Sequence, residues 1–185
     1  MFRPRSSVRG VLHRMVATAL LAGGALWAAP VRAQDAIWLP TPVDGDFNTD
    51  SNWNPTTVPT GTAFFGLSGT TSLTFSALLT TVGGWTFNSG ADNYDFTTGA
   101  GLLTFNGAGI TINGGSATIT ITTITNGTGL AFRNTSTADS ATITNGRIRF
   151  DDASTAGNAT ITNSFVDFRD TSTAGSATIT NSAGL

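Results

Sequence analysis

Residues 129–146 read GLAFRNTSTADSATITNG, residues 147–164 read RIRFDDASTAGNATITNS, and residues 165–182 read FVDFRDTSTAGSATITNS. The second and third segments are identical at 12 of their 18 positions. A fixed period this short indicates one supersecondary unit stacked on copies of itself. The sequence therefore predicts a repetitive scaffold.

Apolar and polar residues alternate within each copy. One alternating pair recurs in all three copies as Leu130 and Phe132, Ile148 and Phe150, and Val166 and Phe168. The run Ala-Thr-Ile-Thr recurs at 141–144, 159–162 and 177–180. Alternation with β-branched residues is typical of half-buried strands, and the Gly, Asn, Asp and Ser residues between the runs favour turns. We expect an all-β protein.

Two or three short strands per 18 residues are too short for a sandwich but suit one coil of a right-handed parallel β-helix, or β-solenoid, with coils of 18–19 residues. Each strand then pairs with its counterpart one repeat later, about 4.8 Å away. Equivalent side chains form columns. We expect one inner column of Phe132, Phe150 and Phe168 and another of Ile143, Ile161 and Ile179.

The outward positions carry charges that alternate in sign at the same period. Arg133, Asp151 and Arg169 follow one another at intervals of 18, and Arg149 is followed by Asp167. Opposite charges across paired strands stabilise by roughly 0.2–1 kcal/mol. We interpret the alternation as a structural feature that favours this register and solubility. The alternative is a carboxylate-lined binding strip.

The chain divides into four predicted regions. Residues 1–33 form a signal peptide, residues 34–62 an irregular N-terminal cap closed by Trp38 and Trp53, residues 63–128 irregular coils, and residues 129–185 the regular repeats. Terminal repeats of a solenoid are atypical because they close the core. Leu185 fits the first inward position of one more coil, so we expect a chain truncated at its C-terminal end.

The signal peptide is predicted from three features: four arginines before residue 15, the apolar stretch 15–29, and Val31-Arg32-Ala33 as a cleavage site. The apolar stretch is shorter than the roughly 20 residues that a spanning helix needs. Beyond residue 33 the chain keeps four arginines and eleven aspartates, a formal charge of −7, with no His, Cys, Lys or Glu. Ser-His-Asp and Cys-His sites, zinc ligand sets and disulfides are therefore excluded.

Carboxylate chemistry remains open, because some β-helices are polysaccharide lyases or hydrolases. Asp151 and Asp152 are adjacent and should point to opposite faces of a strand, whereas Asp152 and Asp170 share a register with Asn134. We interpret these residues as turn formers that bond their own backbone. Asp92 and Asp95, which flank Tyr94, are also expected in a turn. A cluster of Asp44, Asp46 and Asp50 suggests calcium only weakly, since its spacing does not fit an EF-hand.

The segment SNWNPTTVPTGTAFF (51–65), which follows Trp38, is similar to the mature start of large bacterial autotransporter proteins. The STAGxATITN blocks resemble the repeats of their β-helical passenger domains. This resemblance covers most of residues 34–185. It implies export, and then display at the outer membrane by a C-terminal translocator barrel that the sequence lacks.

These observations predict an exported, bacterial cell-surface or extracellular passenger or stalk with a structural or adhesive role. We identify no catalytic, cofactor-binding or metal-binding residue and expect a non-enzymatic protein. The alternative function is a carbohydrate-active β-helix that uses aspartates alone. Surface glycans or proteins are the expected partners. The acidic surface argues against nucleic acid, and no membrane insertion of the mature segment is expected.

Overall fold

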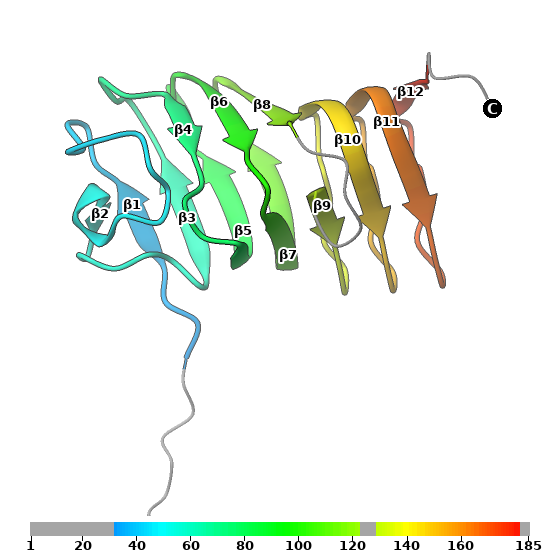
Figure 1. The fold of residues 1–185 in the computed structure, drawn as a ribbon, viewed down its shortest axis with the longest axis horizontal. Helices are drawn as coiled ribbons and strands as arrows, with labels where there is room; N and C mark the ends of the chain where they lie inside the picture. Colours follow the sequence, from blue (N-terminus) through cyan, green and yellow to red (C-terminus); the bar gives the residue numbers. More distant parts are fainter. Residues whose placement is uncertain (1–31, 123–128, 182–185) are drawn as a thin grey trace, which may run out of the picture. The chain divides into compact units, whose positions relative to one another are not determined.

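A computed structural model describes residues 32–122 and 129–181, which are almost entirely β-structure (Figure 1). The predicted signal peptide, apart from Arg32 and Ala33, lies outside the described residues, and so does Leu185. The single helical element in the described part is the short 3-10 helix η1 (Asp50–Asn52). No helix there is long and apolar enough to cross a membrane. The expectation of an all-β protein is confirmed.

Within residues 32–122 and 129–181, twelve strands form one sheet. Their bounds are β1 (Ala36–Trp38), β2 (Trp53–Asn54), β3 (Thr62–Phe65), β4 (Ser72–Thr74), β5 (Leu79–Phe87), β6 (Asn93–Thr98), β7 (Leu102–Ile112), β8 (Ser116–Ile121), β9 (Gly129–Phe132), β10 (Thr142–Phe150), β11 (Thr160–Phe168) and β12 (Thr178–Thr180).

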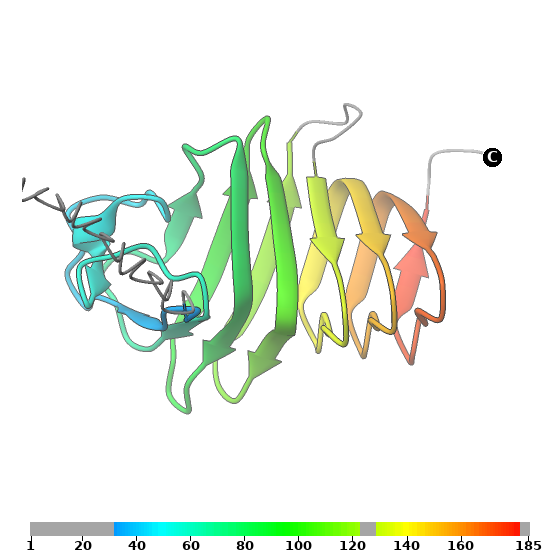
Figure 2. The same cartoon turned by 90° about the horizontal axis from the view of Figure 1, so that it is seen from below.

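The sheet curls so that two rows of strands enclose the core (Figures 1 and 2). One row has the order β1-β3-β5-β7-β9, and the other has the order β4-β6-β8. Strand β10 belongs to both rows: Thr142–Thr144 pair with β8, and Ile148–Phe150 pair with β9. Strand β11 pairs with β10, and β12 pairs with β11. All pairings are parallel except that of β1 with β2, which is antiparallel.

The register predicted for the repeats is confirmed. Ile143 pairs with Ile161 and Ile161 with Ile179, while Phe150 pairs with Phe168. The phenyl rings of Phe132, Phe150 and Phe168 are stacked, with successive centroids 4.9 and 5.0 Å apart. The column also extends one strand further back than expected, because the ring of Phe105 stacks on Phe132 at 5.0 Å.

Upstream of the repeats, where an irregular region was predicted, paired residues lie farther apart in the sequence than in the repeats. Thr62 pairs with Gly84, and Leu102 pairs with Gly129, and both intervals exceed the 18 residues of one repeat. Strand β5 has 9 residues, as have β10 and β11 of the repeats, and β7 has 11. Strand β7 runs through Asn106-Gly107, although an Asn-Gly pair commonly forms a tight turn. Close backbone approach requires glycine nearby, since a Cβ at Gly109 (φ 79°) would collide with the backbone of Thr137.

Aromatic side chains fill the N-terminal end of the core. Trp38 and Trp53, predicted to close the cap, are each 1% exposed and meet edge to face with ring centroids 5.0 Å apart. Phe47 packs against Trp53 at 4.8 Å, and Phe65 stacks on Phe87 at 4.9 Å. Such pairs add to the burial of apolar surface, which is the dominant stabilising term.

Candidate functional site

Six charged side chains and one phenylalanine form a patch on the outer side of β9, β10 and β11. Side chains alternate along a strand, so every second residue points away from the phenylalanine column. Arg147 pairs with Phe165, and Arg149 with Asp167, in the register of β10 and β11. We call this patch the charged strand face; its members are Arg133, Arg147, Arg149, Asp151, Phe165, Asp167 and Arg169.

Each of two aspartates on this face holds two arginines. Asp151 Oδ2 lies 2.7 Å from Arg149 Nε and 3.6 Å from Arg133 Nε. Asp167 Oδ2 lies 2.6 Å from Arg147 Nη2 and 3.5 Å from Arg169 Nη2. The Asp151 side chain is 16% exposed, whereas the Arg133 and Arg169 side chains are 45% and 52% exposed. Both carboxylates are neutralised, and each group of three keeps a net positive charge.

The predicted alternation of charges agrees with the strand register, in which Arg149 is opposite Asp167, but most ion pairs form with other neighbours. Arg133 does form an ion pair with Asp151 across the strands. The ion pair of Arg149 is with Asp151 on its own strand rather than with Asp167. Arg169 likewise pairs with Asp167, two residues before it, rather than with Asp151. The reason is geometric: residues i and i+2 of a strand share a face, and arginine is long enough to reach either neighbour.

The expected turn column of Asn134, Asp152 and Asp170 exists, but its bonding differs from the prediction. Asp152 Oδ2 accepts the Asn134 backbone N–H at 2.8 Å, and Asp170 Oδ2 accepts the Asp152 backbone N–H at 3.1 Å. Each carboxylate thus accepts a backbone N–H of the preceding repeat rather than one of its own turn. All three residues have φ between 55° and 58°, a conformation that Asn and Asp tolerate better than most residues.

The carboxylates of the adjacent residues Asp151 and Asp152 contact different partners. Asp151 bonds the guanidinium groups of the charged strand face, and Asp152 bonds the backbone of Asn134. This separation agrees with the expected opposite orientation of the two side chains. These two carboxylates therefore do not form the pair of acid and base that glycoside hydrolysis uses.

The aspartates of the cap are engaged in hydrogen bonds within the protein. Asp44 Oδ1 accepts from Asn52 Nδ2 at 2.7 Å, and Asp50 Oδ1 accepts from the Val58 backbone N–H at 3.1 Å. Asp46 accepts the Ser76 hydroxyl at 2.6 Å. Burial opposes ionisation of Asp46, but hydrogen bonds from Ser76, Asn48 and Thr49 outweigh it and lower its pKa. Across residues 32–122 and 129–181, no three His, Cys, Asp or Glu side chains are placed to hold a metal ion.

The expectation that Asp92 and Asp95, which flank Tyr94, are turn residues is wrong for Asp95. Tyr94 and Asp95 lie on strand β6. Tyr94 is fully buried, and its hydroxyl donates to the Gly66 carbonyl at 2.8 Å. Asp92 precedes the strand and accepts the Ser68 backbone N–H at 2.9 Å. The polar residues around Tyr94 suggested a turn, but they alternate with apolar ones. In a strand only every second side chain then faces solvent, and Tyr94 is on the buried side.

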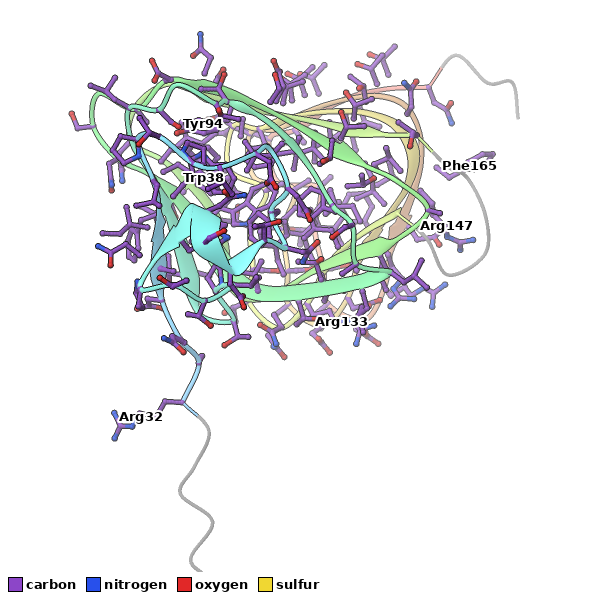
Figure 3. The ribbon with its side chains drawn as sticks, turned by 60° about the vertical axis from the view of Figure 1, so that its left-hand side comes forward. Arg32, Trp38, Tyr94, Arg133, Arg147 and Phe165 are labelled. Carbon is purple, nitrogen blue, oxygen red and sulfur yellow. The ribbon has the colours of Figure 1, made fainter. Side chains whose placement is uncertain are left out.

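Two features of the structure were not predicted from the sequence. Phe165 is 56% exposed, although a large apolar residue in a strand is usually buried. Figure 3 shows Phe165 and Arg147 projecting from the same side of the sheet. A signal for this face does exist, since five of the six differences between the second and third repeats fall within residues 147–153 and 165–171. The other missed feature is Asn52, a buried hub of the cap.

In comparisons with known proteins, no protein-family model, no curated protein and no solved structure matches this chain.

Proposed function

We propose that residues 34–185 are an exported, non-catalytic passenger or stalk of the autotransporter type, built as a right-handed parallel β-helix. The observation that carries this proposal is the parallel pairing of equivalent repeat positions, with Ile143, Ile161 and Ile179 in register. A coil of this kind buries its apolar side chains only against its neighbours, and stacked coils make a long, regular body. Such a body suits a structural or adhesive task at a bacterial surface.

The disposition of the carboxylates supports a non-catalytic role. Asp151 and Asp167 are held by arginines, and Asp152 and Asp170 by backbone N–H groups. General acid catalysis needs a carboxyl group whose hydrogen bonds are free to change during the reaction. In this chain, those four aspartates are used to join one coil to the next.

Export is tested by the fate of the predicted signal peptide. The full chain and a variant lacking residues 2–33 are produced in a bacterial host and fractionated. We expect the full chain outside the cytoplasm with an N-terminus at Gln34, and the shortened variant inside it. Full chain that keeps Met1 and stays in the cytoplasm would contradict the proposal.

The fold and the absence of catalysis need separate tests. An experimental structure of the full chain should show right-handed coils, and left-handed coils would reject that part of the proposal. Incubation with polygalacturonate should release no unsaturated or reducing ends. Turnover that is lost on Asp152→Ala would instead establish a carbohydrate-active enzyme.

A further inference from the structure

We propose that the charged strand face binds an acidic polysaccharide, with its arginines contacting the anionic groups and Phe165 contacting a sugar ring. This inference deepens the proposed function, since an exported stalk meets such polymers outside the cytoplasm. It assigns the adhesive surface to one side of β10 and β11.

The first argument is charge complementarity. The chain beyond residue 33 is acidic, yet all four of its arginines lie on this one face. Their side chains remain 30–52% exposed while they contact Asp151 and Asp167. The face therefore attracts anions although the chain as a whole repels them.

The second argument is the surplus of hydrogen-bond donors. Each guanidinium carries five N–H donors in a planar fork that matches carboxylate or sulfate groups. Arg147 contacts Asp167 through Nη2, and Arg149 contacts Asp151 through Nε. Most donors of the four groups thus remain available, and the aspartates hold the guanidinium groups in position before a ligand arrives.

The third argument is the position of Phe165. It pairs with Arg147 in the register of the sheet, so strand spacing places their Cα atoms roughly 4.8 Å apart. Aromatic residues and arginine are both enriched at the interfaces of proteins with their partners. A flat ring next to a guanidinium group fits a uronate or sulfated sugar, which offers an apolar ring face and an anion together.

Two other aspartates border the face without blocking it. Asp152 and Asp170 lie in the turn after the strands, and one carboxylate oxygen of each accepts a backbone N–H. They disfavour an anion at the turn and direct it toward Arg147 and Arg149. A polymer that engages several arginines at once gains affinity by multivalency.

The experiment measures binding of the purified full-length chain to immobilised polygalacturonate, dextran sulfate, neutral dextran and duplex DNA. The chain is taken from whichever compartment it occupies, so the result does not depend on export. We expect binding to at least one acidic polysaccharide, weakened by salt, and none to dextran. The polygalacturonate and dextran sulfate arms show whether carboxylate or sulfate is preferred.

Two double variants decide the question, since both lower the net charge by two but only one of them changes the charged strand face. Arg147→Gln with Arg149→Gln should weaken binding about tenfold or more, because charge-assisted hydrogen bonds are lost. Thr142→Glu with Thr178→Glu makes the same change of two charges on the outer side of the other row and should leave binding within about twofold. Phe165→Ala should weaken binding about threefold or more if its ring contacts the sugar.

Circular dichroism and thermal unfolding verify the fold of each variant. If the double variant does not fold, Arg169→Gln replaces it, because Arg169 is the most exposed of the four arginines on the charged strand face. Three results would overturn the proposal: no binding to either acidic polysaccharide, equal loss in the arginine and threonine variants, or equally tight binding to duplex DNA. None of them bears on export or on the right-handed coil, which the earlier tests decide.

Discussion

The rings of Phe132 and Phe150 lie almost parallel, with centroids 4.9 Å apart and planes inclined by 9°. The centroid distance matches the spacing of parallel strands, so the side chains repeat the geometry of the backbone. The rings of Phe150 and Phe168 stack in the same way, with centroids 5.0 Å apart and planes inclined by 10°. The stack therefore joins successive repeats through one continuous apolar column.

Replacing Phe150 by alanine should lower the free energy of unfolding by about 3–5 kcal/mol, because it leaves a cavity in the stack between the rings of Phe132 and Phe168. Urea denaturation followed by far-UV circular dichroism measures this loss. Phe165→Ala is the matched control, since the same side chain is removed from an exposed position and should cost under about 1 kcal/mol. Similar losses in both variants would argue against a stabilising role of the column.

Asn52 organises the cap through four hydrogen bonds while fully buried. Its Oδ1 accepts the backbone N–H groups of Val43 and Asp44 at 2.9 and 3.3 Å. Its Nδ2 donates to Asp44 Oδ1 at 2.7 Å and to the Asp46 carbonyl at 2.8 Å. Every polar atom of the side chain is thus satisfied, as buried groups require.

Asn52→Ala should cost about 1–3 kcal/mol for the buried partners that it leaves unsatisfied. Asn52→Asp, which keeps the size but replaces two donors with a carboxylate facing Asp44, should be at least as destabilising at neutral pH. Acidification should restore part of the loss in the aspartate variant only. Thermal melts at two pH values test this, and a stable Asn52→Asp variant would disprove the role of the two donors.

The repeats and the cap differ in how far the sequence predicts them. Phe132, Phe150 and Phe168 recur at one spacing, and strand pairing must align identical apolar positions, so the register follows from the period. Between Thr62 and Leu102 no motif recurs, and the spacing of paired residues differs from one pair of strands to the next. There the coil length depends on loops, whose length costs little free energy and leaves no period in the sequence.

The sequence predicted five of the seven members of the charged strand face, but not Arg147 or Phe165, and it did not predict which ion pairs form. The spacing correctly placed Arg133 beside Asp151. It could not choose between the two neighbours that Arg149 reaches, because both lie within the length of its side chain. The cap was the least predictable part, since Asn52 gains its importance from Val43 and Asp44, which are separated from it by a loop.

Asp152 contributes to stability through both its carboxylate and its backbone conformation, and three substitutions separate the two. Asp152→Asn should be nearly neutral because an amide oxygen still accepts the Asn134 N–H and φ of 58° is tolerated. Asp152→Gly keeps the conformation but loses the hydrogen bond. Asp152→Ala loses both and should cost about 1–3 kcal/mol, the largest loss of the three. Equal melting temperatures for the glycine and alanine variants would rule out a backbone contribution.

Tyr94 should control the stability of the fold at alkaline pH. Burial raises its pKa from 10.0 to about 12; the negative charge of Asp92 adds to the rise, and a hydrogen bond with Ser68 opposes it. Because the folded state favours the neutral phenol, the stabilisation is complete below pH 10 and is lost as the pH rises toward about 12. The chain has no lysine or cysteine, so no other ordinary side chain titrates in this range.

Tyr94 is the only tyrosine, so phenolate absorbance reports its ionisation directly. We expect the absorbance to appear together with the loss of far-UV circular dichroism, above the ordinary titration range of tyrosine. Tyr94→Phe removes the titrating group and should flatten the pH dependence of the melting temperature between pH 10 and about 12, although the loss of the hydrogen bond to Gly66 lowers that temperature at every pH. Phenolate that forms at pH 10 in protein that is still folded would show that Tyr94 is accessible to solvent, contrary to its buried position between the two rows of strands.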